Sequence, residues 1–280
     1  MFRLEKKTAS RKFIDLIKTA VSKLANWEPS IPIEAGDFGT LNHETGQFER
    51  QGNIYKEVEI KSITSKFPPI TGPQIDTYQV ASLTVKKLDV NYAAKSSADS
   101  SSEIIFSGKW QFGRARGALL LMHHSRITRL PDELLQELKL SSWAKGKFIV
   151  THVHTCPAYA LYLSAKNREI VDISLRAFGP RPSSSESATG LGLAAYWVAD
   201  GVPGTFQRAV APEPVFVPLY QLKELRKRTE TRREGSNLVV KEEEAWEPIE
   251  VPWNFLDEDG QEGPEDPEEH SSDYESDKQE

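Results

Sequence analysis

The side chains best suited to chemistry lie close together in one short run, at His152, His154 and Cys156. Imidazole and thiolate are ligands that zinc prefers, and residues two apart on a strand project from one face. Such side chains run parallel instead of converging, and no fourth ligand is evident, so a sheet face or a core position explains them better. A cysteine nucleophile would also need a base within hydrogen-bond reach and a group that orients the base. We therefore expect no metal, no cofactor and no enzyme.

Other anion-binding and catalytic motifs are weak. The pair Gly190 and Gly192 forms only a GxG, which is too short for a dinucleotide-binding fingerprint. Aromatic and basic residues alternate from Lys109 to Phe112, but none of the common nucleic-acid recognition signatures is present. The densest group of carboxylates lies near the C-terminus, away from any cleft that would pair an acid with a base. No nucleic-acid partner is predicted.

Composition limits the class of protein. The chain has 280 residues, 38% of them apolar, and a single cysteine, which fits a reducing intracellular compartment. It contains no run of eighteen apolar residues and no signal-peptide pattern at its start. We expect a soluble, cytoplasmic protein in its inactive form.

Charge divides the chain unevenly. Residues 241–280 hold 17 Asp and Glu against two Lys, whereas the rest holds 33 Lys and Arg against 24 Asp and Glu. A basic body joined to an acidic tail indicates a body that binds an anionic partner and a tail that masks the same surface. A disordered tail that only improves solubility explains the composition equally well.

The first 25 residues have the pattern of a basic amphipathic helix. Phe13, Ile17 and Leu24 recur at helical spacing, and seven Lys and Arg face only two acidic residues. Such a helix is attracted to anionic lipid headgroups, although a surface helix of an ordinary domain has the same pattern. A second basic helix is predicted over 219–233.

Two long amphipathic hairpins are predicted. The first runs from about Val80 to Phe112 with a bulge at Lys86–Lys87, and the second spans 147–178 with a turn at 166–168. Pro157 should interrupt the first arm of the second hairpin, because it cannot donate to a ladder. The apolar faces of the two hairpins contain Val80, Leu83, Val85, Ile104, Phe106, Trp110, Tyr159, Leu161, Val171, Ile173 and Leu175.

Shorter elements complete the prediction. Residues 31–55 have the turn spacing of short strands, and Pro131 starts a helix near 131–140 with Leu134, Leu135 and Leu138 inward. Trp246 and Trp253 indicate that the start of the acidic tail docks on the body. The predicted fold class is α+β: a twisted, mainly antiparallel sheet with two amphipathic hairpins, flanked by basic amphipathic helices.

The order of these elements resembles the pore-forming N-terminal domain of the gasdermins, and in particular the fungal gasdermin-like proteins of regulated cell death and heterokaryon incompatibility. The resemblance spans roughly residues 1–230 and rests on scattered short motifs. They are the basic first helix and the segments 27–29, 36–39, 52–55, 108–113, 116–120, 156–162 and 217–223.

The resemblance implies a pyroptosis-like, autoinhibited protein that a protease or a partner variant releases. It implies binding to acidic phospholipids of the inner plasma membrane, self-assembly, and insertion of both hairpins as strands of an oligomeric pore. Lipid-headgroup contacts would fall on Arg11, Lys12 and Lys18, with Trp27 near the membrane-touching tip. Lys223, Arg226 and Lys227 are further candidates.

This chain departs from the mammalian pattern because only a short acidic tail follows the last basic segment. We expect residues 1–233 to form the pore-forming domain and residues 234–280 to form a largely disordered, inhibitory tail, with a cleavage region at Arg232 and Arg233. The alternative is a soluble α+β protein-interaction module with a solubilising tail, which predicts neither lipid preference nor leakage.

Overall fold

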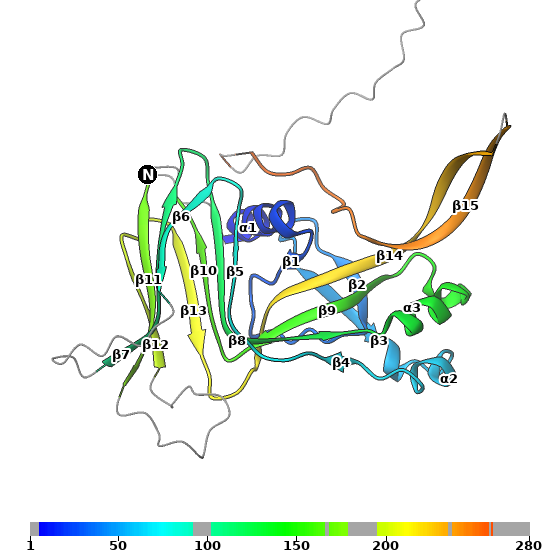
Figure 1. Cartoon of the computed structure of the whole chain (residues 1–280), viewed down its shortest axis with the longest axis horizontal. Coiled ribbons are helices and arrows are strands. Elements are labelled where there is room, and N and C mark those ends of the chain that lie inside the picture. Colours follow the sequence, from blue (N-terminus) through cyan, green and yellow to red (C-terminus); the bar gives the residue numbers. More distant parts are fainter. Residues whose placement is uncertain are drawn as a thin grey trace, which may run out of the picture.

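Two antiparallel β-sheets and three α-helices make up the described part of the chain (Figure 1). The computed structural model describes residues 6–91, 102–165, 168–178, 195–234, 237–257 and 259. The predicted class, a mainly antiparallel α+β protein, is confirmed.

The helical elements are few and short apart from the first. They are α1 (Lys6–Val21), α2 (Lys61–Thr64), α3 (Asp132–Lys139) and the 3₁₀ turns η1 (Ile54–Lys56) and η2 (Ser142–Ala144). The strands are β1 (Leu24–Ala25), β2 (Asp37–Leu41), β3 (Phe48–Asn53), β4 (Ile70–Thr71), β5 (Ile75–Ala81), β6 (Val85–Asn91), β7 (Ser102–Phe112), β8 (Ala118–Arg129), β9 (Phe148–Cys156), β10 (Ala158–Leu163), β11 (Ile170–Phe178), β12 (Ala195–Asp200), β13 (Thr205–Val210), β14 (Phe216–Glu234) and β15 (Asn237–Pro248).

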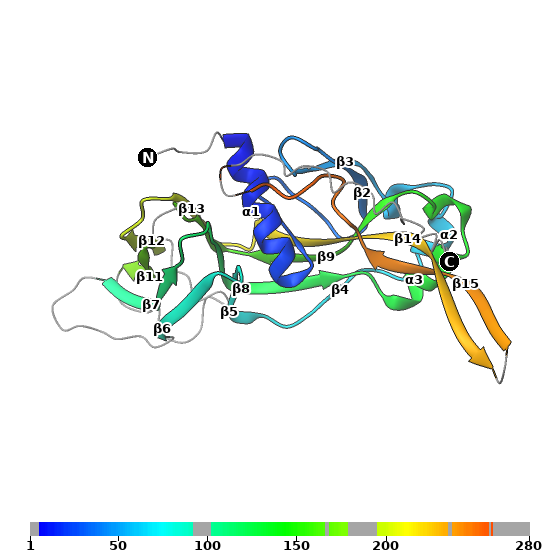
Figure 2. The same cartoon turned by 90° about the horizontal axis from the view of Figure 1, so that it is seen from above.

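The larger sheet has 11 strands and is built around β8, which changes partners along its length. Its first half pairs with β10 and β5, and its second half pairs with β9 and β4. β14 continues the sheet beyond β9, and β15 folds back along the far end of β14 as a two-stranded ribbon. The ribbon extends away from the rest of the molecule (Figures 1 and 2).

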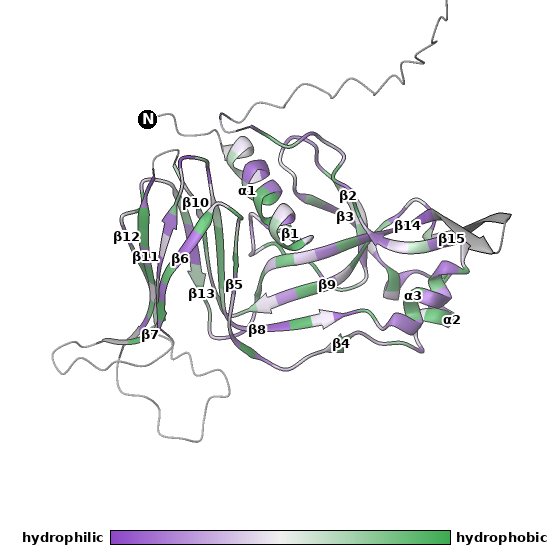
Figure 3. Cartoon of the chain, turned by 45° about the horizontal axis from the view of Figure 1, so that its top comes forward, coloured by the Kyte–Doolittle hydropathy of each residue, from purple (hydrophilic) through white to green (hydrophobic). Residues whose placement is uncertain are grey.

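The smaller sheet has four strands in the order β12-β11-β7-β6. It contains two hairpins, β6–β7 and β11–β12, joined by pairing of β7 with β11. One of its faces packs on β8, β10 and β13, and buries Phe106, Trp110, Ile173 and Trp197 to 2% exposure or less. The hydropathy colouring shows these apolar stretches side by side in the two layers (Figure 3).

Several predicted elements are confirmed. The first hairpin exists with its bulge, which falls between Lys87 and Asp89. The short strands of 31–55 are β2 and β3, and the helix near 131–140 is α3, with all three predicted leucines buried. Pro157 separates β9 from β10, because its ring nitrogen has no hydrogen to donate to the ladder.

The predicted second hairpin is wrong. Its two arms do not pair: β10 lies between β8 and β13 in the larger sheet, whereas β11 lies between β7 and β12 in the smaller one. Tyr159 and Leu161 therefore belong to the body, and the true second hairpin is β11–β12. Its connection, residues 179–194, and the predicted turn residues Lys166 and Asn167 lie outside the described residues.

The first arm of the first hairpin begins at Val85, later in the chain than predicted. Val80 lies on β5 and pairs with Leu120 of β8, while Leu83 lies in the turn before β6 with 81% of its surface exposed. Val85 begins β6 and does belong to the hairpin. A turn at 82–84 thus sends the chain from one sheet to the other, which alternation alone does not reveal.

The second basic helix is wrong as well, since 219–233 lies within β14. Leu219, Tyr220 and Leu222 are all buried, because this part of the strand is covered on both faces. Leu219, Leu222 and Leu225 therefore have the three-residue spacing of a helix although they lie in a strand. Beyond Lys223 the strand is held by its ladder with β15.

A strand pair spans the predicted domain boundary at residue 233. Residues 237–248, which belong to the tail predicted to be largely disordered, form β15 and pair with residues 223–234 across that boundary. Residues 260–280 lie outside the described part. The two-part organisation stays a prediction.

Candidate functional site

The candidate site is the outer face of α1 together with residues 249–256, which we call the strap. Helix α1 buries Phe13, Ile14 and Ile17 completely against the sheet, as its apolar spacing predicts. The helix ends at Val21, where Ser22 adopts a positive φ of 54° and donates its amide to the Lys18 carbonyl. The strap leaves β15 and passes along the helix (Figures 1 and 2).

Main-chain oxygens of the strap accept hydrogen bonds from basic side chains of α1. Lys12 Nζ donates to the Leu256 carbonyl at 2.6 Å, and Arg11 Nη2 donates to the Asn254 carbonyl at 2.8 Å. Lys18 Nζ donates to the Ile249 carbonyl in the same way. The strap therefore presents oxygen acceptors to three basic side chains of the helix.

The strap also binds the acidic residue in the middle of this face. Trp253 Nε1 donates to Asp15 Oδ1 at 2.9 Å, and the Leu256 amide donates to Asp15 Oδ2 at 3.2 Å. The Trp253 ring also lies 5.2 Å from the Arg11 guanidinium, within the range of a cation–π interaction. Burial raises the pKa of Asp15, although the Trp253 and Leu256 hydrogen bonds and the charges of Arg11 and Lys12 act in the opposite direction.

The covered cations differ in accessibility. Arg11 and Lys12 are only 5% and 6% exposed, whereas Lys18 remains partly exposed. Burial lowers the pKa of Lys18, and the nearby Glu250 carboxylate partly offsets that effect. These three predicted lipid-contact residues do lie together on one helix face.

The other predicted contact residues lie elsewhere. Trp27 is 2% exposed and packs on Phe13, with ring centroids 5.4 Å apart, so it does not form an exposed tip in this structure. Lys223, Arg226 and Lys227 lie on β14. Arg226 bridges Glu224 and the strap residue Glu250, and so contributes to holding the strap.

A second anchor fixes the chain just before the strap. Trp246 of β15 donates its indole N–H to the Leu135 carbonyl of α3 at 2.7 Å, and Glu244 forms an ion pair with Lys145 at 3.2 Å. The Ile249 amide donates to the Leu222 carbonyl at 3.2 Å, and Ile249 itself is buried. Docking of the tryptophan-containing segment, predicted from the sequence, is confirmed.

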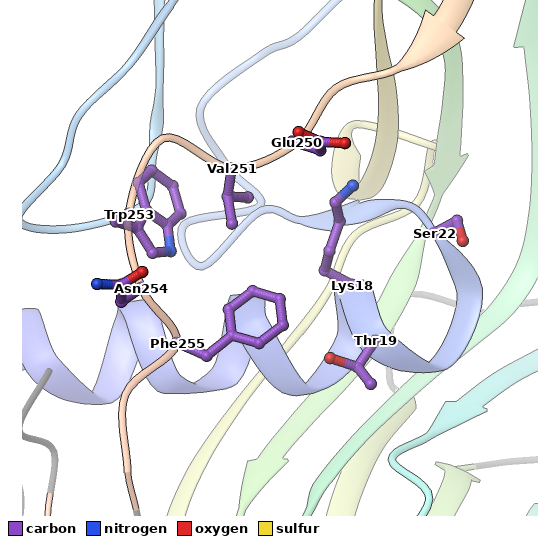
Figure 4. Close-up of a pocket in the computed structure, with 8 residues that line it drawn as sticks. All are labelled: Lys18, Thr19, Ser22, Glu250, Val251, Trp253, Asn254 and Phe255. Carbon is purple, nitrogen blue, oxygen red and sulfur yellow. The ribbon is translucent and has the colours of Figure 1, made fainter. Parts of the chain in front are cut away.

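The strap and α1 line an open pocket between them (Figure 4). Its volume is about 490 Å³. The lining residues are Lys18, Thr19, Ser22, Glu250, Val251, Trp253, Asn254 and Phe255.

The smaller sheet is the second part of the site. β7 and β11 are 11 and 9 residues long, and a bilayer-spanning strand needs about 9–11 residues. Phe106, Trp110, Val171, Ile173 and Leu175 share its inner face, while Lys109 and Asp172 pair on the outer face at 3.5 Å. The predicted inward position of Ile104 is wrong, because a bulge pairs Ile104 with Arg176 and Ile105 packs on the inner cluster instead. The inner face is covered by residues of β8, β10 and β13.

Polar groups mark the junction between the two sheets. The Phe112 amide at the end of β7 donates to the Glu169 carbonyl, just before β11, at 2.8 Å. Arg116 Nη1 donates to the Ser164 carbonyl at 3.1 Å, and the Ser164 hydroxyl accepts the Gly117 amide at 2.7 Å. Burial raises the pKa of Glu169. Both hairpins thus join the body at one buried hydrogen-bonded site.

His154 and Cys156 of β9, which the sequence offered as metal ligands, are buried in the structure. His154 Nε2 lies 2.9 Å from Lys23 Nζ, and burial lowers the pKa of His154 to about 3. Cys156 is fully buried, and burial raises the pKa of its thiol. Within the described residues, no three His, Cys, Asp or Glu side chains are grouped as metal ligands would be.

Sequence reasoning missed the role of Asp15 and the partners of the strap. The carboxylate and the Trp253 indole are separated by 238 residues, so spacing gives no information about their contact. The available signal was one acidic residue within a basic amphipathic helix, together with tryptophans in an acidic tail.

No protein-family model and no curated protein matches the chain. The chain is similar to the cryo-EM structure of the gasdermin A3 membrane pore, with 11% identity and a TM-score of 0.23. The match covers 88% of this chain and 97% of that one. A TM-score this low carries no argument, so the proposals below rest on the geometry of this chain.

None of the described helices is long and apolar enough to span a bilayer.

Proposed function

We propose that this protein permeabilises membranes that contain acidic phospholipids, and that the strap holds it inactive. The observation that carries the proposal is the seating of three strap carbonyls on Arg11, Lys12 and Lys18. Phosphate oxygens of a lipid headgroup have the same acceptor chemistry and add a negative charge, so they compete for the same donors. Displacing the strap exposes a basic amphipathic helix to the membrane surface.

The two hairpins supply the part that enters the bilayer. The inner face of the smaller sheet is apolar and its outer face carries charge, as a strand between lipid and a water-filled lumen requires. Because unpaired strand edges are not tolerated in hydrocarbon, insertion requires neighbouring copies of the chain to close a barrel. The proposed active form is therefore a self-assembled pore in the plasma membrane, and the inactive form is cytoplasmic.

Release requires an event that acts on the tail. A protease that cuts near Arg232 and Arg233, or a partner that displaces the strap, would meet this need. Both arginines lie in the β14–β15 ladder. The proposed biological outcome is regulated cell death, such as fungal heterokaryon incompatibility.

The test compares three chains that differ only in where they end. A chain ending at Pro248 lacks the strap, a chain ending at Asp257 keeps the strap but lacks the acidic remainder, and the third is full length. Dye leakage is measured from vesicles of phosphatidylcholine with and without phosphatidylserine. We expect the chain ending at Pro248 to release dye from the anionic vesicles, and the other two to remain silent.

The control chain separates the strap from the acidic remainder. Leakage by the chain ending at Asp257 would assign inhibition to the remainder instead. If the chain ending at Pro248 neither binds nor permeabilises anionic vesicles while remaining folded, the proposal fails and the protein-interaction module becomes the better account.

A further inference from the structure

The pocket lies between the strap and α1, next to the points at which the strap is attached. The strap is attached at Ile249 by Lys18, and again from Trp253 to Leu256 by Arg11, Lys12 and Asp15. Beside these attachments the strap and the helix leave an open pocket of about 490 Å³. Figure 4 shows Val251 and Trp253 above the helix, Phe255 alongside it, and Lys18 rising toward Glu250. A pocket of this volume is in the range that binds a small ligand.

Lys18 is the member of the cation group that a ligand can reach first. It lines the pocket and is partly exposed, whereas Arg11 and Lys12 lie almost completely under the strap. Partial desolvation disfavours its ammonium form, and a bound anion would reverse that penalty. The pocket therefore offers one accessible cation whose charge an anionic ligand stabilises.

The remaining lining favours an apolar group next to that anion. Phe255 is 49% exposed, although it is a large apolar residue, and Val251 and Trp253 are half-buried beside it. Covering an exposed phenyl ring with an alkyl chain removes apolar surface from water. A free phosphate ion cannot use this surface, but a molecule that joins a phosphate to a short chain can.

We propose that this pocket is the site at which a phosphate-bearing lipid first binds the closed protein. The headgroup phosphate accepts hydrogen bonds from Lys18, and the beginning of the acyl chain lies along Val251, Trp253 and Phe255. This inference rests on the proposed function and adds the point of entry. Because the phosphate competes with the Ile249 carbonyl for Lys18, lipid binding loosens that end of the strap, while the attachments to Arg11 and Lys12 keep the full chain closed until a cut or a partner acts on the tail.

The carboxylate of Glu250 lines the same pocket and repels a bound anion. Its side chain is 82% exposed and bonded to Arg226, so its repulsion is weakened by solvent but not removed. Glu250→Gln is therefore expected to tighten binding of an anionic ligand. A site that depended on hydrophobic contact alone would not respond to this change.

The experiment measures binding to the full chain by titration calorimetry. The probes are dihexanoyl phosphatidic acid below its micelle concentration, dihexanoyl phosphatidylcholine, and inorganic phosphate. We expect saturable binding of the phosphatidic acid and much weaker binding of the other two. Lys18→Gln should weaken the affinity about tenfold through loss of a charge-assisted hydrogen bond, while Lys61→Gln, on the distant helix α2, should not change it.

A second variant tests the pocket without touching the attachments of the strap. Phe255→Ser should weaken phosphatidic acid about tenfold and leave inorganic phosphate unchanged, because only the lipid buries the phenyl ring. Amide exchange of residues 249–256 verifies that each variant keeps the strap closed. Equal affinity for inorganic phosphate and lipid, or no effect of Phe255→Ser, would overturn the proposal.

Failure of the pocket and failure of the pore function give different results. If the chain ending at Pro248 permeabilises anionic vesicles but the full chain does not bind phosphatidic acid, the function stands and the pocket inference is wrong. If the full chain binds the probe through Lys18 and Phe255 but the shortened chain is silent on every vesicle, the pocket is a lipid site without the proposed function.

Discussion

The apolar face of the smaller sheet and the basic face of α1 are both covered, but by very different parts of the chain. The apolar face is closed by β8, β10 and β13, which are strands of the main sheet. The basic face is closed by eight residues that hold on through carbonyl oxygens, one indole and one main-chain amide. A polar cover of this kind yields to competing anions or to a cut, whereas an apolar cover opens only when the hairpins move.

This difference sets an order of events in the proposed mechanism. Uncovering α1 requires loss of a few charge-assisted hydrogen bonds, each worth about 1.5–3 kcal/mol. Uncovering the sheet requires exposure of Phe106, Trp110, Ile173 and Trp197, which is unfavourable in water but not in a bilayer. The strap is therefore expected to leave first, and the hairpins to follow only at the membrane.

The largest expected effect comes from placing a charge in the apolar cover. Ile173 is 1% exposed between the two sheets, so Ile173→Asp buries a carboxylate without a partner. We expect a loss of about 4 kcal/mol or more in the free energy of unfolding, measured by urea denaturation.

Ser174→Asp is the matched control, since Ser174 lies on the opposite face of β11. Its effect should stay within about 1 kcal/mol. Similar losses for both variants would mean that the inner face is not a packed apolar interface.

Acid is expected to loosen the sheet that carries both covers. Burial lowers the pKa of His123 and His154 to about 3, well below the value of about 6.5 in an unfolded chain. The unfolded state therefore binds protons first, and the free energy of unfolding falls as the pH drops from about 6.5 toward 3. Each histidine contributes up to about 1.4 kcal/mol per pH unit in that range.

His154→Gln should make the free energy of unfolding less dependent on pH, because one of the two buried histidines is removed. The free energy of unfolding is measured by denaturation at several pH values between 7.5 and 4.5, and the variant is compared with its own value at pH 7.5. An unchanged slope would show that His154 is accessible to protons in the folded protein.

A smaller effect is expected at the polar cover. Trp253→Ala removes the indole donor to Asp15 and the ring beside Arg11, which together contribute about 2 kcal/mol to strap attachment. Amide protection of residues 249–256 should fall while the urea midpoint of the body stays unchanged.

Trp246→Ala serves as the matched control, because Trp246 fixes β15 to α3 and does not contact α1 in the interactions described above. It should lower protection in β15 more than in the strap. Equal loosening of the strap by both variants would show that the strap and β15 open as one unit.

The smallest effect is expected on the outer face of the smaller sheet. Lys109 and Asp172 are each about half exposed, with side-chain exposures of 45% and 51%. Lys109→Met should change the free energy of unfolding by less than about 0.5 kcal/mol, since solvent screens such pairs. A loss above about 1 kcal/mol would indicate that the pair contributes to joining the two hairpins.

Much of the fold could be predicted because local patterns specify faces. Alternation in β7 and β11 gave the buried side of each strand, helical spacing gave α1 and α3, and Pro157 gave a strand break. Partners could not be predicted in the same way. β10 and β11 are successive strands that each bury apolar side chains, yet they belong to different sheets, because alternation contains no information about which strand lies alongside.

The sequence by itself determined a basic amphipathic helix, an apolar hairpin face and an acidic, tryptophan-containing tail, since each depends on residue types at short spacing. Only the tertiary structure decided that 219–233 is a strand, because burial on both faces at the start of this stretch, from Leu219 to Leu222, removes the alternation that would identify it. Only the tertiary structure joined Asp15 to Trp253 and placed three carbonyls over Arg11, Lys12 and Lys18. Such contacts depend on where the chain returns in space, and hydrogen bonds to main-chain oxygens leave no residue type to detect.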